Sequence, residues 1–172
     1  SATPAIATSL ARDPRPDRPL FVAGLLLVLV IVFAGFAPTF YLKGLFGTPP
    51  LSNLLFAHGL IMSTWIALLV AQTALVEFGR TDLHRQLGVA GAGVAVLLVV
   101  IGAAAALGAA RRGFSPTPLV TPLMFLAIPL VDLLVFSILV GTALAMRRRS
   151  ATHKRLMLLA TVGMLTPAVA RL

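Results

Sequence analysis

Long apolar stretches, separated by short polar and basic segments, make up almost the whole chain after residue 18. Each stretch is close to the about 20 residues that an α-helix needs to cross the hydrocarbon of a bilayer at about 1.5 Å per residue. None alternates apolar and polar residues as a barrel strand does, and backbone groups inside a bilayer must be hydrogen-bonded within their own segment. The pattern predicts an all-α integral membrane bundle of about five transmembrane helices, at about 20–41, 52–76, 87–110, 118–146 and 154–172.

Polar residues and prolines indicate where these helices begin and end. Residues 1–18 are polar and rich in proline, which predicts a flexible cytoplasmic tail followed by one transmembrane domain over 19–172. In the fourth stretch, prolines at 118, 122 and 129 predict a late helix start, a kink near Pro129, or both. The chain ends at Leu172 without a polar tail, so we expect the natural protein to be longer.

The composition supports a membrane protein and excludes several kinds of site. Hydrophobic residues make up 59% of the chain and charged residues 11%, whereas soluble domains have about 45–50% and about 25%. The absence of cysteine excludes disulfides, zinc–thiolate sites, iron–sulfur clusters held by this chain and cysteine nucleophiles. No phosphate-binding loop, HExxH motif or hydrolase triad is present in the sequence, so it offers no catalytic residues of the kind found in soluble enzymes.

The net charge of +9 comes largely from short basic runs beside the apolar stretches. Basic residues accumulate in cytoplasmic loops, and with the amino terminus inside, ten fall on the cytoplasmic side against four on the other, which predicts an N-in, C-out topology. We expect the basic runs to contact anionic lipids rather than nucleic acid. The expected headgroup contacts are Arg80, Arg85, Arg147, Arg148, Arg149, Lys154 and Arg155.

Asp132 is the most unusual residue, because it is a carboxylate inside the fourth apolar stretch. A charged residue at the centre of a transmembrane helix costs about 2.5–3.5 kcal/mol on insertion scales. It could be a proton-relay acid, an ion ligand, a counter-charge, or a structural residue hydrogen-bonded between helices. Depth along the expected helices predicts an intramembrane polar cluster in the outer half, made of His58, Ser63, Thr64, Asp132 and Arg171.

The three histidines are candidate ligands of haem or a pigment. His58 stands between alanine and glycine, which leave room for a flat macrocycle, although a hydrogen-bonded histidine is the simpler interpretation. His84 and His153 each begin a helix on the cytoplasmic side, and a bis-histidine haem needs two ligands at equal depth. Both are next to basic residues, so contact with lipid phosphates is the alternative interpretation.

The segments around these two histidines repeat the pattern Arg-x-x-x-His-basic-x-Leu, at 80–87 and 149–156, which indicates either a duplicated two-helix unit or a chance match. Residues 84–88 (HRQLG) are similar to a His-Arg-x-Leu-Gly element in a family of predicted bacterial membrane proteins of unknown function. Residues 153–157 (HKRLM), followed by Arg171, resemble that family's His-Arg-Arg-Trp-Met…Arg helix, with Leu156 in place of its tryptophan. The resemblance covers about residues 50–172 and implies a multi-pass protein of the bacterial inner (cytoplasmic) membrane.

Three functions are compatible with these features. The first is a non-catalytic accessory or assembly subunit of a larger membrane complex, of the electron-transport or photosynthetic kind, whose partners are lipids and other membrane subunits. Short loops and the glycine- and alanine-rich stretch 87–110, which favours close helix packing, motivate it. The second is a b-type haem redox carrier that uses two of the histidines, and the third is a small proton-linked transporter centred on Asp132.

Overall fold

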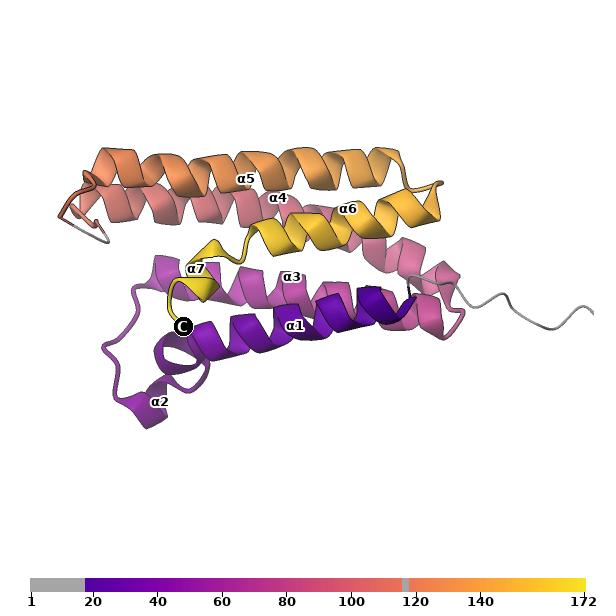
Figure 1. Ribbon diagram of the computed structural model, residues 1–172, viewed down its shortest axis with the longest axis horizontal. Helices are drawn as coiled ribbons and strands as arrows, with labels where there is room; N and C mark the ends of the chain where they lie inside the picture. The colour runs from indigo at the N-terminus through magenta and orange to yellow at the C-terminus, as the bar shows by residue number, and fades with distance from the viewer. Residues whose placement is uncertain (1–17, 116–117) are drawn as a thin grey trace, which may run out of the picture.

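The computed structural model describes residues 18–115 and 118–172, and its regular elements are helices, with no strand in this part of the chain (Figure 1). Four helices are long and apolar enough to cross a membrane. They are α1 (Arg18–Phe36, extended by the π-helical turn η1, Ala37–Tyr41), α3 (Asn53–Glu77), α4 (Thr81–Arg111) and α5 (Pro122–Ala145). Three shorter helices accompany them: α2 (Lys43–Phe46), α6 (Ser150–Gly163) and α7 (Thr166–Val169). The predicted tail lies, but for Arg18, outside the described residues.

The outer surface of the long helices is apolar. Between 17% and 28% of the residues in their most apolar windows are buried inside the protein, so most of these residues are partly or fully exposed. Large exposed residues include Val30, Val89 and Leu123. Contiguous apolar surface of this extent is rare on soluble monomers and is what a bilayer solvates. The prediction of an all-α fold is confirmed for the described residues, and four helices able to cross a membrane agree with the multi-pass prediction.

The predicted fifth helix over 154–172 is not a continuous span. Helix α6 begins earlier, at Ser150, and ends at Gly163, and the chain turns before the short α7. Pro167 gives a physical reason, because proline lacks an N–H and its ring clashes with the carbonyl group four residues earlier, which here belongs to Gly163. The 14 residues of α6 cover about 21 Å, less than the about 30 Å of hydrocarbon in a bilayer.

The other helix boundaries differ from the predictions by smaller amounts. Helix α4 begins at Thr81 instead of residue 87, so that His84 lies within its first turns. The predicted late start of the fourth stretch is confirmed, because α5 begins at Pro122 and then continues through Pro129. Helix α1 ends at Phe36, and Pro38 lies in the wider turn η1, where Leu42 N–H donates to the Ala37 carbonyl at 2.7 Å.

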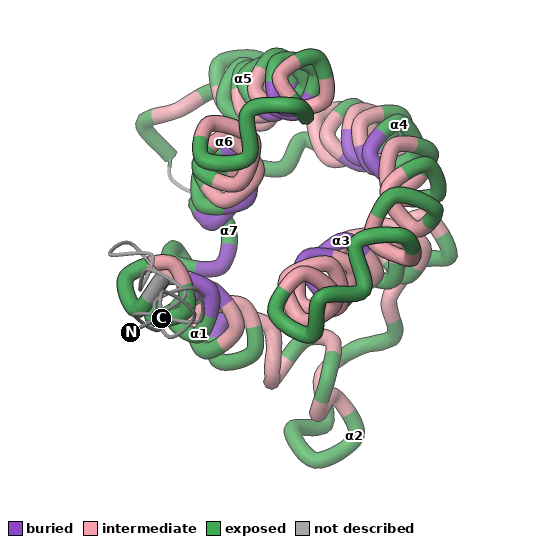
Figure 2. The backbone as a smooth tube through the Cα atoms, turned by 90° about the vertical axis from the view of Figure 1, so that its right-hand side faces the viewer, coloured by how far each residue is buried: buried purple, intermediate pink, exposed green. Residues whose placement is uncertain are grey.

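Viewed along its long axis, the bundle has α1, α3, α4, α5 and α6 arranged in a ring (Figure 2). Helix α3 packs on α4, α4 on α5 and α5 on α6, while α1 contacts α6 and α7. Side chains meet at the centre, where Phe136 of α5 is 1% exposed and contacts Trp65 of α3 edge to face at 5.0 Å between ring centroids. Trp65 Nε1 donates to Thr161 Oγ1 of α6 at 3.1 Å. This central core ties together helices that are not neighbours around the ring.

The two ends of the bundle carry different side chains. One end holds the start of α1, α4 and α6 and the finish of α3 and α5, and most of the arginines lie there; we call it the basic end. The opposite end holds η1, the start of α3 and α5, and α7 (Figure 1). We call it the cavity end, for the feature described next.

Candidate functional site

The cavity end contains a largely apolar cavity of about 400 Å³. Its walls come from α1, η1, α3, α4, α5, the end of α6 and α7, with Phe36, Phe40 and Trp65 among the aromatic residues. Its polar side chains are few and come from distant parts of the sequence: Thr39, Tyr41, His58, Asp132, Thr161 and Arg171. An apolar cavity of a few hundred Å³ with a small number of polar groups is typical of a small-molecule site.

Three residues of the predicted polar cluster line this cavity: His58 on α3, Asp132 on α5 and Arg171 beyond α7. The other two, Ser63 and Thr64, are not part of the lining. Ser63 Oγ donates to the Gly59 carbonyl at 2.8 Å and is hydrogen-bonded to Tyr41 Oη at 2.9 Å. Thr64 Oγ1 donates to the Leu60 carbonyl at 2.9 Å.

The helical period explains why His58 lines the cavity while Ser63 and Thr64, on the same helix, do not. Residues four and seven positions apart share one face of an α-helix, so Met62 and Trp65 follow His58 into the cavity. Ser63 and Thr64 are five and six positions from His58 and point to other sides of α3. Depth along the helix was the basis of the predicted cluster, and depth does not determine which side of a helix a residue occupies.

The polar groups of the lining have unused hydrogen-bonding capacity. His58 Nδ1 is buried without a hydrogen-bond partner among the described residues. The Asp132 carboxylate makes no hydrogen bond or ion pair with the described part of the chain. Buried polar atoms are nearly always hydrogen-bonded in folded proteins, so His58 Nδ1 is a candidate for contact with a ligand or with water. The half-buried Asp132 carboxylate adds a further acceptor to the same lining.

Arg171 is positioned by the packing of α7 against α1. A Cβ atom on Gly35 would lie 2.4 Å from the Ala168 carbonyl oxygen, so glycine is required for this close approach. The Arg171 guanidinium then lies over the ring of Phe36, with 4.8 Å from Cζ to the ring centroid, and donates to the Pro167 carbonyl. Its remaining N–H groups are oriented by a cation–π contact rather than by a carboxylate.

The floor of the cavity was missed by the sequence analysis. Trp65 and Thr161 line it and are hydrogen-bonded to each other beneath it. Trp65 is the single tryptophan of the chain and lies seven positions after His58, which is the signal that could have placed both on one helix face. Thr161 carries no comparable signal, because its partner is 96 positions away in the sequence.

At the basic end, the structure brings His84 of α4 and His153 of α6 together. Their ring centroids are 6.3 Å apart and the ring planes are nearly perpendicular, at 88°. His58 lies at the opposite end of α3. The backbone of Gln72, next to His84, is 14 positions along α3 from His58, or about 21 Å at the helical rise. His58 therefore cannot share a ligand with the other two histidines.

One imidazole of this pair is fixed by the main chain. His153 Nδ1 donates to the Ala143 carbonyl of α5 at 2.8 Å, which leaves Nε2 as the free nitrogen. The His84 imidazole lies near the backbone of Gln72 on α3, and its Nδ1 is buried and has no partner among the described residues. Hydrogen bonds from one ring nitrogen to a carbonyl are the usual way to orient a histidine whose other nitrogen binds a metal.

The basic residues expected to contact lipid headgroups lie at the same end of the bundle and are mostly more exposed than the two histidines. Arg80, Arg85, Arg155 and residues 147–149 are exposed, whereas His84 and His153 are half-buried. Lys154 is half-buried, with Nζ 5.9 Å from the centre of the Phe21 ring on α1. Histidine and basic residues are neighbours in the sequence, but in the folded helices the histidines are half-buried and the arginines are exposed.

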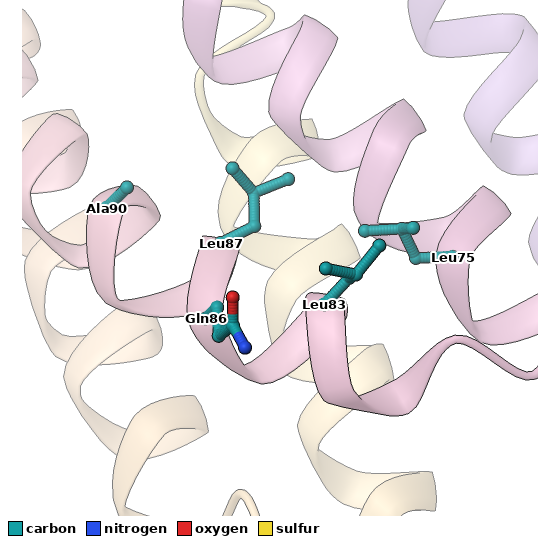
Figure 3. A pocket seen from close by; sticks show the side chains of 5 residues that line it. All are labelled: Leu75, Leu83, Gln86, Leu87 and Ala90. Carbon is teal, nitrogen blue, oxygen red and sulfur yellow. The ribbon is translucent and has the colours of Figure 1, made fainter.

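A second depression, also of about 400 Å³, lies between the end of α3 and the start of α4. Leu75 from α3 faces Leu83 and Leu87 from α4, and Gln86 is the polar residue that the view labels (Figure 3). No charged or histidine side chain lines it. It is an apolar surface feature without groups that would select a ligand.

Comparisons of the chain with protein-family models, with curated proteins and with solved structures found no match. The resemblance carried by residues 84–88 and 153–157 therefore receives no support from a family model.

Proposed function

We propose that this protein is an integral membrane subunit that binds a b-type haem between His84 and His153 and serves electron transport. The single observation that carries the proposal is the imidazole pair at 6.3 Å with perpendicular rings. It joins two helices, α4 and α6, that come from distant parts of the sequence and pack on α5 rather than mainly on each other.

The separation of the two rings suits a shared metal ion. An imidazole nitrogen binds a metal at about 2.0–2.1 Å, so two imidazoles on opposite sides of one ion place their ring centroids roughly 6 Å apart. The free Nδ1 of His84 and the free Nε2 of His153 provide one ligand atom each. A stacked or hydrogen-bonded histidine pair would need no unpartnered buried nitrogen.

The shortage of other ligands favours haem over a bare metal ion. No group of three or more His, Cys, Asp or Glu residues able to hold a metal occurs within the described ranges, and the chain has no cysteine. Structural zinc takes four protein ligands and catalytic zinc takes three. A haem needs only axial ligands from the protein, because the macrocycle supplies the rest of the coordination sphere.

The location of the pair fits a role at the membrane surface. The proposed topology puts the basic end at the cytoplasmic face, because basic residues accumulate there. The proposed haem then lies near that face, where exposed arginines would also engage acidic lipids or the propionates of the cofactor. Electron exchange with other membrane subunits is the role that such a position favours.

The test is an ultraviolet–visible spectrum of the protein, produced with a supply of haem precursor and purified in mild detergent. We expect a Soret band, α and β bands after dithionite reduction, and one haem per chain. The perpendicular ring planes also predict a strongly anisotropic low-spin electron paramagnetic resonance signal in the oxidised form.

Matched variants separate the histidines. H84A and H153A are expected to lose the low-spin spectrum, whereas H58Q keeps it, because His58 is at the other end of α3. A featureless wild-type spectrum at full haem supply contradicts the proposal and favours an accessory subunit without a cofactor. Loss of the haem in H58Q together with its retention in H84A also contradicts it.

A further inference from the structure

We infer that the cavity at the other end of the bundle binds the ring of a neutral lipid-soluble quinone or quinol. This inference concerns His58, Asp132 and Arg171 and stands independently of the proposed haem at His84 and His153.

The size and walls of the cavity suit one substituted ring. A volume of about 400 Å³ lies at the lower end of the about 300–1,000 Å³ typical of small-molecule sites. Phe40 and Trp65 provide faces for ring contacts, and the small Gly102, Ala105 and Ala106 of α4 form another wall. Ring faces that pack on flat aromatic side chains gain contact area without disturbing their neighbours.

The charges of the lining favour a neutral head group. One guanidinium and one carboxylate, Arg171 and Asp132, line the same space, and their formal charges cancel. An anionic lipid or fatty acid would be attracted by the first group and repelled by the second, and burying an unpaired charge in an apolar cavity is costly. A neutral molecule with oxygen atoms on opposite sides of a ring avoids that cost.

The hydrogen-bonding capacity matches both redox forms of such a molecule. Arg171 and a neutral His58 can donate to a quinone carbonyl, and the Asp132 carboxylate can accept from a quinol hydroxyl. His58 Nδ1 and the Asp132 oxygens have no partner in the described part of the protein, so a ligand would meet capacity that the protein leaves unused. The inference concerns binding and assigns no electron transfer.

The chain contains its own reporter of occupancy. Trp65 is the only tryptophan and lines the cavity, and quinones quench tryptophan emission on close contact. We would titrate the full chain in detergent with a short-tailed benzoquinone and follow Trp65 fluorescence, corrected with free tryptophan at equal absorbance. Saturable quenching is expected, whereas quenching no stronger than that of free tryptophan overturns the inference.

Variants identify the groups involved. R171Q replaces the guanidinium with a shorter, neutral side chain, and H58F removes a donor; each is expected to weaken quinone binding about ten-fold, the effect of losing a hydrogen bond in a buried site. D132L should leave quinone affinity within about two-fold and weaken quinol binding more, because it removes the acceptor, which asparagine would keep. A106F fills part of the cavity and is expected to abolish saturable quenching. T64A, which lies outside the lining and whose native hydroxyl donates to the Leu60 carbonyl, is the matched control and should bind as the wild type does.

Two further measurements distinguish quinone binding from a haem-dependent effect and from binding of an anionic lipid. H84A removes the proposed haem ligand, so unchanged quinone binding in H84A shows that the cavity does not depend on the haem. Dodecanoate serves as the anionic probe. If it displaces quinone with equal affinity, and if R171Q weakens binding while H58F does not, the ligand is an anionic amphiphile and the quinone inference is wrong.

Discussion

The two ends of the bundle each hold histidine, yet their surroundings differ in a way that suggests different ligands. At the basic end, His153 is fixed by a backbone carbonyl, and the rings of His84 and His153 face each other across a short distance. At the cavity end, His58 has no such anchor and shares an apolar space with groups of opposite charge. A pair fixed in place suits a metal at a defined distance, whereas a loosely held set of donors suits a ligand bound through several contacts.

The central core connects the two ends, and truncating its most deeply buried aromatic residue should affect both. Phe136 is 1% exposed and contacts Trp65, and truncation of a buried phenylalanine costs about 3–5 kcal/mol. F136A is therefore expected to lower the free energy of unfolding by that amount, measured by chemical unfolding in detergent. The haem spectrum and the quinone titration should both weaken, and loss of only one would show that the ends are less coupled than the packing indicates.

Gly35 provides a way to alter the cavity end alone. In G35A the added methyl group meets the Ala168 carbonyl oxygen at 2.4 Å, so α7 must move away from α1 and take Arg171 with it. Overpacking of this kind costs about 1–3 kcal/mol, and quinone affinity should fall while the haem spectrum stays constant. The control is G141A in α5, where nothing lies within 4 Å of the new methyl group. G141A should stabilise the helix by about 0.5–1 kcal/mol, so equal destabilisation of both variants would contradict the packing argument.

Thr161 tests the hydrogen bond beneath the cavity. T161V keeps the shape of the side chain and removes the acceptor of Trp65 Nε1, whose residue is 4% exposed. An unpaired buried N–H costs about 1–3 kcal/mol. We expect a lower midpoint in thermal unfolding and a blue shift of Trp65 emission, with the haem spectrum unchanged. Unaltered emission would mean that the indole finds another acceptor.

The smallest effect per substituted residue is expected from the exposed arginines of the basic end. Replacement of Arg147, Arg148 and Arg149 by glutamine should weaken association with anionic lipid about five-fold per charge, measured by competition with fluorescent phosphatidylglycerol in nanodiscs. R111Q/R112Q, at the other end of α4, is the control for general charge loss. Equal losses in the two sets of variants would show that lipid contact does not distinguish the ends.

The sequence was most informative where hydropathy alone decides the structure, and least informative where the direction of a side chain decides it. Four long helices follow from apolar runs that lipid can solvate. The fifth failed because average hydropathy does not register Pro167, which ends α6 at Gly163. Depth was enough to propose His58, Asp132 and Arg171 together, but the direction in which Ser63 and Thr64 point required the positions of the neighbouring helices. The pairing of Trp65 with Thr161 depends on how α3 and α6 meet, which no local pattern contains.

The interruption between α6 and α7 has a consequence for how the protein enters the membrane. A segment of 14 regular helical residues is below the about 17–25 that the insertion machinery recognises as a span. We therefore expect that residues 150–172 do not partition into the bilayer by themselves. They would enter as the second arm of a hairpin with α5, to which a loop of four residues (146–149) connects them. The close approach of Gly35 to Ala168 can form only after that step, so completion of the cavity would be a late event in biogenesis, after the long helices are already in the membrane.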